Sequence, residues 1–440
     1  MRGLSTRAWI PVAAAMVAVL LVGLQVAAGR AGFQGPLHSL ISDYVATPRS
    51  ATVPWVGLGV AVVGVSNRCR IYALSTAAAL DVVFAAERLV RGGVFTFGNG
   101  PLIVLTGLTV LVLWRWEGVT RTCALRGIAF GILFILATKV GDTWLRITAI
   151  VRPTVLDEYA LLADHALAQP SWLLGRVVDA AGPVLSGVLH WVYIELPAAA
   201  LVIALYQLRN VTTAGWPRHF IIRTFLLLGL IGPVIYVMFP LVGPDFAFGT
   251  AGRGFQVASY WPHVLPPVDL TPRAIAFDDE TARNCMPSMH TGWALAVFIH
   301  TRGAPRWLRW GGTFWLVGTI AATLGFGYHY GVDLVAGAVL CLTVESALRE
   351  PVRGHRWSRM QLVAGGSAFL AVLLLCCRYL AEPIARYPIL FGPLIIGTSV
   401  AYATVFYVTF FAPRRGGELR DAIAVARTVP QQNRPEPECG

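Results

Sequence analysis

Two short segments near the middle of the chain carry side chains that could do chemistry together. The first covers residues 285–290 and reads Cys-Met-Pro-Ser-Met-His. Ser is a favoured helix cap and Pro fits a first turn, so the spacing predicts a helix that opens at Pro287 and Ser288, with His290 in its first turn. A helix N-terminus offers free backbone N–H groups and a positive dipole, which favour a bound phosphate.

The second segment covers residues 329–333 and reads His-Tyr-Gly-Val-Asp. His329 and Asp333 are four residues apart, so on a helix they would share one face. A carboxylate in that position can hold one imidazole nitrogen and leave the other free to attack or to accept a proton. The two histidines and Asp333 therefore predict phosphoryl transfer that needs neither a metal ion nor a cofactor.

Both segments resemble motifs of the type 2 phosphatidic acid phosphatase superfamily. Residues 287–290 resemble its Pro-Ser-Gly-His motif, and residues 329–333 resemble the end of its third motif, His-x-x-x-Asp. Residues 164–171 and 236–244 are most similar to the branch that contains inositol phosphorylceramide synthases and their bacterial relatives. The resemblance covers residues 125–348. It departs from the phosphatases where Ala322-Thr323 replaces a Ser-Arg pair, and where no Lys-x6-Arg-Pro lies shortly before Pro287.

The resemblance implies a role for each motif residue. His329 would be the nucleophile and would form a phosphohistidine. Asp333 would orient His329 and stabilise its imidazolium form, as the acid of a catalytic triad does. His290 would protonate the leaving oxygen and later accept a proton from the acceptor. Ser288 would bond a phosphoryl oxygen or merely cap the helix, and the sequence leaves both readings open.

Phosphate charge calls for fixed cations, and three residues are candidates. Arg283 lies just before the first motif. Lys139 and Arg146 have the Lys-x6-Arg spacing of the family's first motif, but they follow a different predicted helix. An alternative for this pair is a juxtamembrane position near lipid headgroups.

The composition is that of a polytopic membrane protein. Of the 440 residues, 56% are hydrophobic and only 13% are charged. The net charge of +12 is spread over short loops between apolar runs, so we expect no nucleic-acid partner. The seven cysteines show no paired spacing, although one disulfide between Cys285 and Cys376 or Cys377 stays open.

Apolar runs predict an all-α fold with about twelve transmembrane helices, six of them in a catalytic core. We expect accessory membrane helices in residues 1–122, the core in 123–348 with outer loops at 141–182 and 243–287, two membrane helices in 349–412, and a disordered tail in 413–440. The predicted spans are residues 8–29, 51–66, 71–89, 101–114, 124–140, 183–208, 220–242, 289–300, 312–328, 331–347, 362–380 and 389–411.

Arginine placement predicts the orientation. With both termini in the cytoplasm, every short inner loop is rich in arginine, and His290 and His329 fall at the outer face. We expect a multi-pass protein of the cell membrane, in a bacterium the plasma membrane. The first outer segment contains Asp157 and Asp164, and its apolar spacing predicts interfacial amphipathic helices. Tyr193, on the sixth span, would face the active site or pack in the core.

The sequence therefore predicts a membrane phosphotransferase or phosphatase that acts on a lipid phosphate or phosphodiester. The departures from the phosphatases favour an alcohol acceptor over water. Partners would be the lipid substrate, an alcohol acceptor and membrane lipids. The alternative is a non-enzymatic transporter of lipids or small molecules, which the span count and three acids within predicted spans support: Asp81, Glu87 and Glu195.

Overall fold

The chain is an all-α polytopic membrane protein, as the sequence predicts. The computed structural model describes residues 6–352 and 356–411. Within these residues, seven helices are long and apolar enough to cross a membrane, and four further apolar helices are shorter. Each of the twelve predicted spans contains at least one helix. The predicted tail at 413–440 lies outside the described residues.

The amino-terminal helices pack around a core of their own. Buried aliphatic side chains of α3, α4, α5 and α6 form this core, with Leu58, Leu105 and Ile128 among them. The elements of this part are α1 (Thr6–Arg30), α2 (Pro36–Val45), α3 (Thr52–Ala61), the 3-10 turn η1 (Val62–Gly64), α4 (Asn67–Val90), α5 (Asn99–Arg115) and α6 (Gly118–Val151).

A larger core joins α6 to the remaining helices. In this part, α14 packs against α8 and α13, and α15 packs against α13, α11 and α16. The elements are α7 (Asp157–Asp164), η2 (His165–Leu167), α8 (Pro170–Ile194), α9 (Leu196–Leu208), α10 (Val211–Ala214), α11 (Ile221–Met238), α12 (Pro244–Phe248), α13 (Met289–His300), α14 (Arg306–Gly325), α15 (Gly331–Leu348), α16 (Arg356–Tyr379), α17 (Ala381–Arg386) and α18 (Pro388–Phe410).

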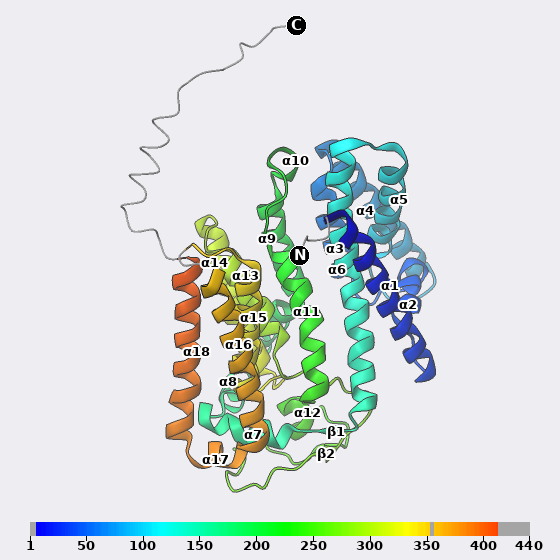
Figure 1. Cartoon of the computed structure of the whole chain (residues 1–440). Helices are drawn as coiled ribbons and strands as arrows, with labels where there is room; N and C mark the ends of the chain where they lie inside the picture. The colour runs from blue at the N-terminus through cyan, green and yellow to red at the C-terminus, as the bar shows by residue number, and fades with distance from the viewer. Residues whose placement is uncertain (1–5, 353–355, 412–440) are drawn as a thin grey trace, which may run out of the picture.

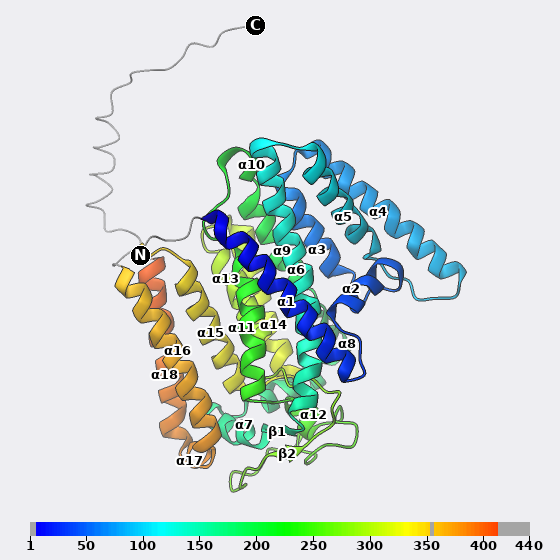
Figure 2. The ribbon, with the colours of Figure 1, turned by 45° about the vertical axis from the view of Figure 1, so that its right-hand side comes forward.

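The two ends of the bundle hold different short elements (Figure 1). One end holds α7, α12, α17 and the antiparallel strands β1 (Thr154–Val155) and β2 (Ile275–Ala276), and the other end holds α10. Figure 2 shows α16 and α18 on one side of the molecule and α4 and α5 on the opposite side, as Figure 1 does. Which end faces the cytoplasm stays a prediction from the arginine pattern.

The segment 141–182 differs from the predicted outer loop. α6 continues to Val151, and α8 begins at Pro170, with a kink at Gly182 and Pro183. Between these helices, α7 is almost wholly buried, so it is not the predicted interfacial amphipathic helix. Its three acids, Asp157, Glu158 and Asp164, accept hydrogen bonds from backbone N–H groups inside the protein, which explains why a segment with this many acidic residues can be buried. Residues 243–287 contain only the short elements α12 and β2.

Small residues bring α3 and α6 into backbone contact. A Cβ atom on Gly131 would lie 2.3 Å from the Gly57 carbonyl oxygen, and one on Gly127 would lie 2.6 Å from the Ala61 carbonyl oxygen. This is the pairing of small residues at four-residue spacing that lets membrane helices approach closely. Close backbone packing therefore holds α3 to α6.

We expect Gly131→Val to destabilise the protein by at least about 1–3 kcal/mol, because the added side chain overpacks this contact. Thermal unfolding of the detergent-solubilised protein measures the effect. Gly107→Val, on α5, is the matched control, since a Cβ at Gly107 meets nothing within 4 Å. Equal destabilisation by both variants would show that helix propensity, and not the α3–α6 contact, is responsible.

Candidate active site

His329 lies in the short connection between α14 and α15, and not on a helix as its spacing predicts. Its Nδ1 atom is 3.7 Å from Oδ2 of Asp333, too long for a hydrogen bond. Nδ1 instead lies 2.9 Å from the backbone carbonyl oxygen of Cys285, which can only accept. The proton of the neutral imidazole is therefore on Nδ1, and Nε2 keeps its lone pair. This is the form that a nucleophilic histidine needs.

Asp333 is the centre of the buried contacts around His329. Its Oδ2 accepts a hydrogen bond from the Tyr330 N–H group at 2.8 Å, which caps the first turn of α15. The same oxygen accepts from the Cys285 thiol at 2.6 Å. Burial and the neighbouring Asp333 raise the pKa of the Cys285 thiol well above its usual range, so the thiol remains a donor. Cys285 is free, so the disulfide with Cys376 or Cys377 is not formed.

The first motif, residues 285–290, lies against the first turn of α15. α13 begins at Met289, so Ser288 is the cap and Pro287 lies one residue before it. The Ser288 Oγ accepts from the Thr291 N–H group at 3.4 Å, and the Ser288 N–H donates to the Asp333 carbonyl at 3.0 Å. This geometry is that of the helix cap, one of the two readings that the sequence left open. His290 lies in the first turn, as predicted.

Two aspartates of α7, to which the sequence assigns no role, support the second motif. Asp157 accepts from the Tyr330 hydroxyl at 2.8 Å and from the backbone N–H groups of Val242 and Gly243 at 3.1 and 2.9 Å. Asp164 accepts from the Val332 N–H group at 2.9 Å, at the N-terminus of α15. Burial raises the pKa of both carboxyl groups to about 7, and these backbone donors oppose the increase. The signal in the sequence for this supporting role of Asp157 and Asp164 was their acidic side chains in an otherwise apolar segment.

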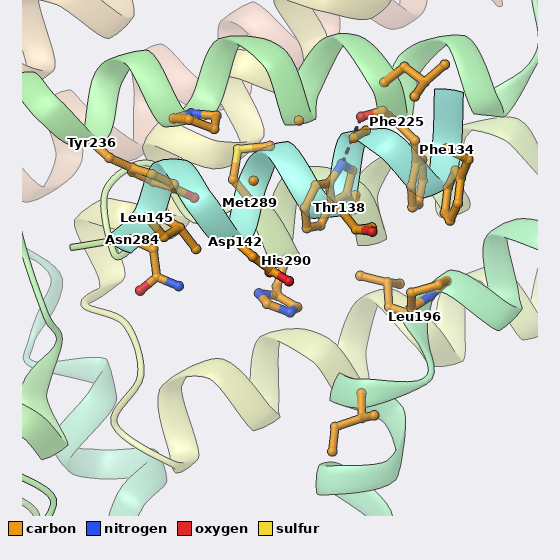
Figure 3. A pocket seen from close by; sticks show the side chains of 18 of the residues that line it. Phe134, Thr138, Asp142, Leu145, Leu196, Phe225, Tyr236, Asn284, Met289 and His290 are labelled. Atoms are coloured by element: carbon orange, nitrogen blue, oxygen red, sulfur yellow. Dashed lines mark hydrogen bonds between the residues drawn. The ribbon is translucent and has the colours of Figure 1, made fainter. Parts of the chain in front are cut away.

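His290 opens onto a cavity of about 380 Å³ (Figure 3). Its ring stacks on that of Tyr193, with the centroids 3.9 Å apart, and Tyr193 in turn lies 5.2 Å from the ring of Tyr328. Tyr193 therefore connects His290 to the residue before His329. The cavity wall is largely aromatic and aliphatic, and His329 is not among the described residues that line it.

The three predicted phosphate-binding cations have other partners. Arg283 is fully buried and donates to the backbone carbonyls of residues 152, 278 and 281. Lys139 forms a buried ion pair with Asp43 of α2 and bonds Ser39 at 3.2 Å. Arg146 lies 3.9 Å from Glu280 and above the ring of Phe33. None of the three lines the cavity.

Two clusters in the described residues each bring three potential metal ligands within 4.8 Å. One is the buried set Cys285, His329 and Asp333, and the other is the partly buried set His219, His300 and Glu345. In the second cluster, the side-chain oxygen of Gln207 accepts a hydrogen bond from the Ile221 N–H group. The side-chain nitrogen of Gln207 therefore faces His300 and donates to its Nδ1 at 2.8 Å. The His300 proton is then on Nε2, which donates to Glu345 at 2.9 Å. In both clusters, the histidine nitrogen that faces the carboxylate carries a proton: Nδ1 of His329 faces Asp333, and Nε2 of His300 faces Glu345. Both arrangements are those of a hydrogen-bond network.

Two family models match separate parts of the chain. Residues 8–147 match a domain of unknown function, DUF5933, and residues 163–347 match the PAP2 superfamily. We refer to residues 163–347, the segment that matches this superfamily, as the PAP2 domain. The predicted resemblance to this superfamily is confirmed, whereas the similarity to the inositol phosphorylceramide synthase branch stays a prediction. Comparison with curated proteins and with solved structures gave no significant match.

The PAP2 domain contains both motif segments, the last two residues of α7 (Ala163 and Asp164), and the helices from α8 to α15. Its presence supports a membrane activity of the phosphatase or phosphotransferase type in general. The α6 wall of the cavity lies in the other matched segment.

We expect Cys285→Ala to destabilise the protein by about 1–3 kcal/mol, because Asp333 loses a buried donor. Cys285→Ser keeps a donor and should retain most of the stability. Thermal unfolding in detergent compares the two variants. Equal loss in both would mean that the size of the sulfur atom, and not its hydrogen bond, is what the site requires.

Asp164 gives a pH-dependent prediction. Its pKa of about 7 in the folded state is above the ordinary value near 4, so its ionisation is more costly in the folded than in the unfolded state. Its contribution to stability is full below about pH 4, falls as the pH rises to about 7, and is constant above that. We expect the unfolding temperature of Asp164→Asn to vary less between pH 5 and 7.5 than that of the wild type. The exposed Asp269→Asn is the control, and a wild-type slope in Asp164→Asn would contradict the prediction.

Proposed function

We propose that this protein is a membrane phosphotransferase or phosphatase that acts on a lipid phosphate or phosphodiester at the extracytoplasmic face, through a phosphohistidine on His329. The observation that carries the proposal is the hydrogen bond from His329 Nδ1 to the Cys285 carbonyl. It leaves Nε2 unprotonated, in a site that also holds the N-terminus of α13, whose second residue is His290. Nucleophilic catalysis needs such a nitrogen, held in one tautomer.

The reaction divides into two displacements. In the first, Nε2 of His329 attacks phosphorus, a P–N bond forms, and the bond from phosphorus to the leaving alkoxide oxygen breaks as His290 donates a proton to that oxygen. In the second, water or an alcohol attacks the phosphohistidine, His290 accepts the proton of the attacking hydroxyl, and the P–N bond breaks. Asp333, 3.7 Å from Nδ1, favours positive charge on the ring during both steps.

An alcohol acceptor is favoured over water for two reasons. The Ser-Arg pair of the phosphatases is absent, with Ala322 and Thr323 in its place. The cavity beside His290 is mostly apolar, which suits a lipid or an alcohol and limits the access of bulk water. With Lys139, Arg146 and Arg283 engaged elsewhere, we assign the phosphoryl oxygens to backbone N–H groups at the start of α13.

The transporter alternative loses much of its support, because the acids within predicted spans have local partners. Asp81 accepts from the Trp55 indole and from the N–H groups of Gly98 and Gly100. Glu87 pairs at 2.9 Å with Arg91, the residue that follows the same helix, and Glu195 accepts from a threonine hydroxyl of α3. These contacts join neighbouring helices or lie on one helix surface, so they do not mark a path through the membrane.

The covalent intermediate tests the enzyme proposal. In wild type, rapid acid-free quenching after addition of a phosphate-labelled lipid should trap an acid-labile, base-stable adduct on His329. His329→Ala should form none, because the proposal assigns the attack on phosphorus to Nε2 of His329. His290→Ala should form and lose the adduct at least about 10²-fold more slowly, as expected for loss of a general acid and base.

Mapping of the adduct to His290, or its persistence in His329→Ala, would reverse the two roles. An active preparation that forms no adduct would replace the two-step scheme with direct transfer. Lipid movement without cleavage, unchanged in His290→Ala and Asp333→Asn, would favour the transporter.

The orientation has a separate test. A cysteine at Leu265, which is exposed in the segment 243–287, should react with an impermeant thiol reagent in intact cells. A cysteine at Arg306, the exposed first residue of α14, should react only after the membrane is opened. Both variants carry Cys285→Ser to remove background. Reversed labelling would refute the orientation and the outer-face substrate with it.

A further inference from the structure

The cavity beside His290 is built by both matched segments of the chain. The PAP2 domain provides residues of α8, α9, α11 and α13, together with Asn284, to its wall. The remaining wall is α6, which lies almost entirely within the segment matched to the domain of unknown function. The α6 residues that line the cavity are Phe134, Ala137, Thr138, Gly141, Asp142 and Leu145.

Asp142 is the one acid among the residues that line this cavity. Its side chain is exposed at the wall, and Figure 3 shows it directed into the same space as His290. The two cations that flank it on α6 are paired elsewhere, Lys139 with Asp43 and Arg146 with Glu280. Among the described residues, no hydrogen bond or ion pair to the Asp142 carboxylate is formed. A carboxylate in an apolar membrane cavity without a partner is costly, so its presence calls for a ligand.

The chemistry of a carboxylate limits what that ligand can be. An ionised carboxylate only accepts hydrogen bonds, and it repels phosphoryl oxygens. It therefore suits a group that brings hydroxyl donors and no negative charge. Asn284, Tyr193 and Tyr236, which also line the cavity, can both donate and accept, as polyhydroxylated ligands require.

We propose that Asp142 recognises the alcohol acceptor by accepting hydrogen bonds from its hydroxyl groups, so that the α6 wall selects a neutral polyol over water. This inference rests on the proposed function for the transfer step, while the binding step stands by itself. It assigns to the amino-terminal segment a part in substrate selection, since that segment brings the acceptor-binding carboxylate to the cavity of the PAP2 domain.

The binding test uses His329→Ala, in which no transfer occurs, and glycerol with propan-1-ol as a matched three-carbon pair. Binding is followed by the fluorescence of Trp293, which lines the cavity near His290. We expect glycerol to bind more tightly than propan-1-ol, and Asp142→Asn to weaken glycerol binding by about 10–100-fold, as expected for loss of hydrogen bonds to a charged group. Propan-1-ol binding should change little. Asp179→Asn, an exposed acid of α8 outside the cavity, is the control.

The transfer test starts from the phosphohistidine, formed with labelled phosphatidic acid in micelles and then treated with buffer or glycerol. In Asp142→Asn, the glycerol concentration that gives half-maximal breakdown should rise by about 10–100-fold, while breakdown in buffer alone and adduct formation should change by less than about threefold.

The outcomes separate the two proposals. Equal glycerol binding by Asp142→Asn and its parent would overturn the acceptor role of Asp142. Tighter binding of ethanolamine than of glycerol would assign the carboxylate to an ammonium ligand and overturn the polyol. A loss of adduct formation in Asp142→Asn would place Asp142 in the donor step and also contradict the inference. Asp142-dependent glycerol binding in a protein that forms no adduct would contradict the proposed function and leave the polyol site in place.

Discussion

The hydrogen bond between the His329 imidazole and the Cys285 carbonyl joins two segments that lie 44 residues apart in the chain. It is backed by a second link in the same place, where the Cys285 thiol donates to Asp333. Both links require the start of α15 to lie against the loop before α13. Gly337 allows this, because a Cβ there would lie 2.1 Å from the Ser288 carbonyl oxygen. The Nδ1–H tautomer of His329 thus depends on helix packing as much as on any acid.

The supports of this junction are themselves buried and titratable. Asp157 and Asp164 reach it from α7, one to the Tyr330 hydroxyl and one to the Val332 N–H group. A buried carboxylate that accepts several N–H bonds is held firmly in position, since its movement would leave buried polar groups without partners. These contacts explain how the end of the bundle with little regular structure can still hold a histidine in one orientation.

The sequence predicted the helices well because their signal is local. Apolar runs of sufficient length predict membrane helices, and a Ser before Met-His predicts the start of α13. Partners of single charges are not local. Lys139 meets Asp43 about a hundred residues earlier, and Arg283 bonds carbonyls of its own loop, so neither could be assigned from spacing. The same limit applies to α6, whose Gly141-Asp142-Thr143 looks like a loop until the cavity beside it is known. His329 and Asp333 lie 3.7 Å apart, but the four-residue spacing suggested a shared helical face with a carboxylate–imidazole bond, and it missed the Cys285 carbonyl that bonds the imidazole instead.

α6 belongs to two cores at once, with Phe134 in the larger one and Ile135 in the smaller one. Because both cores share this helix, the two matched segments cannot be separated without disrupting packing. A recombination event that joined this PAP2 domain to an unrelated amino-terminal partner would keep every motif residue, yet it would leave one wall of the cavity missing and expose apolar surface to lipid. Inheritance of the two segments as a single unit is therefore the expected evolutionary pattern, and exchange between relatives should succeed only where the break falls outside the helix that both cores share.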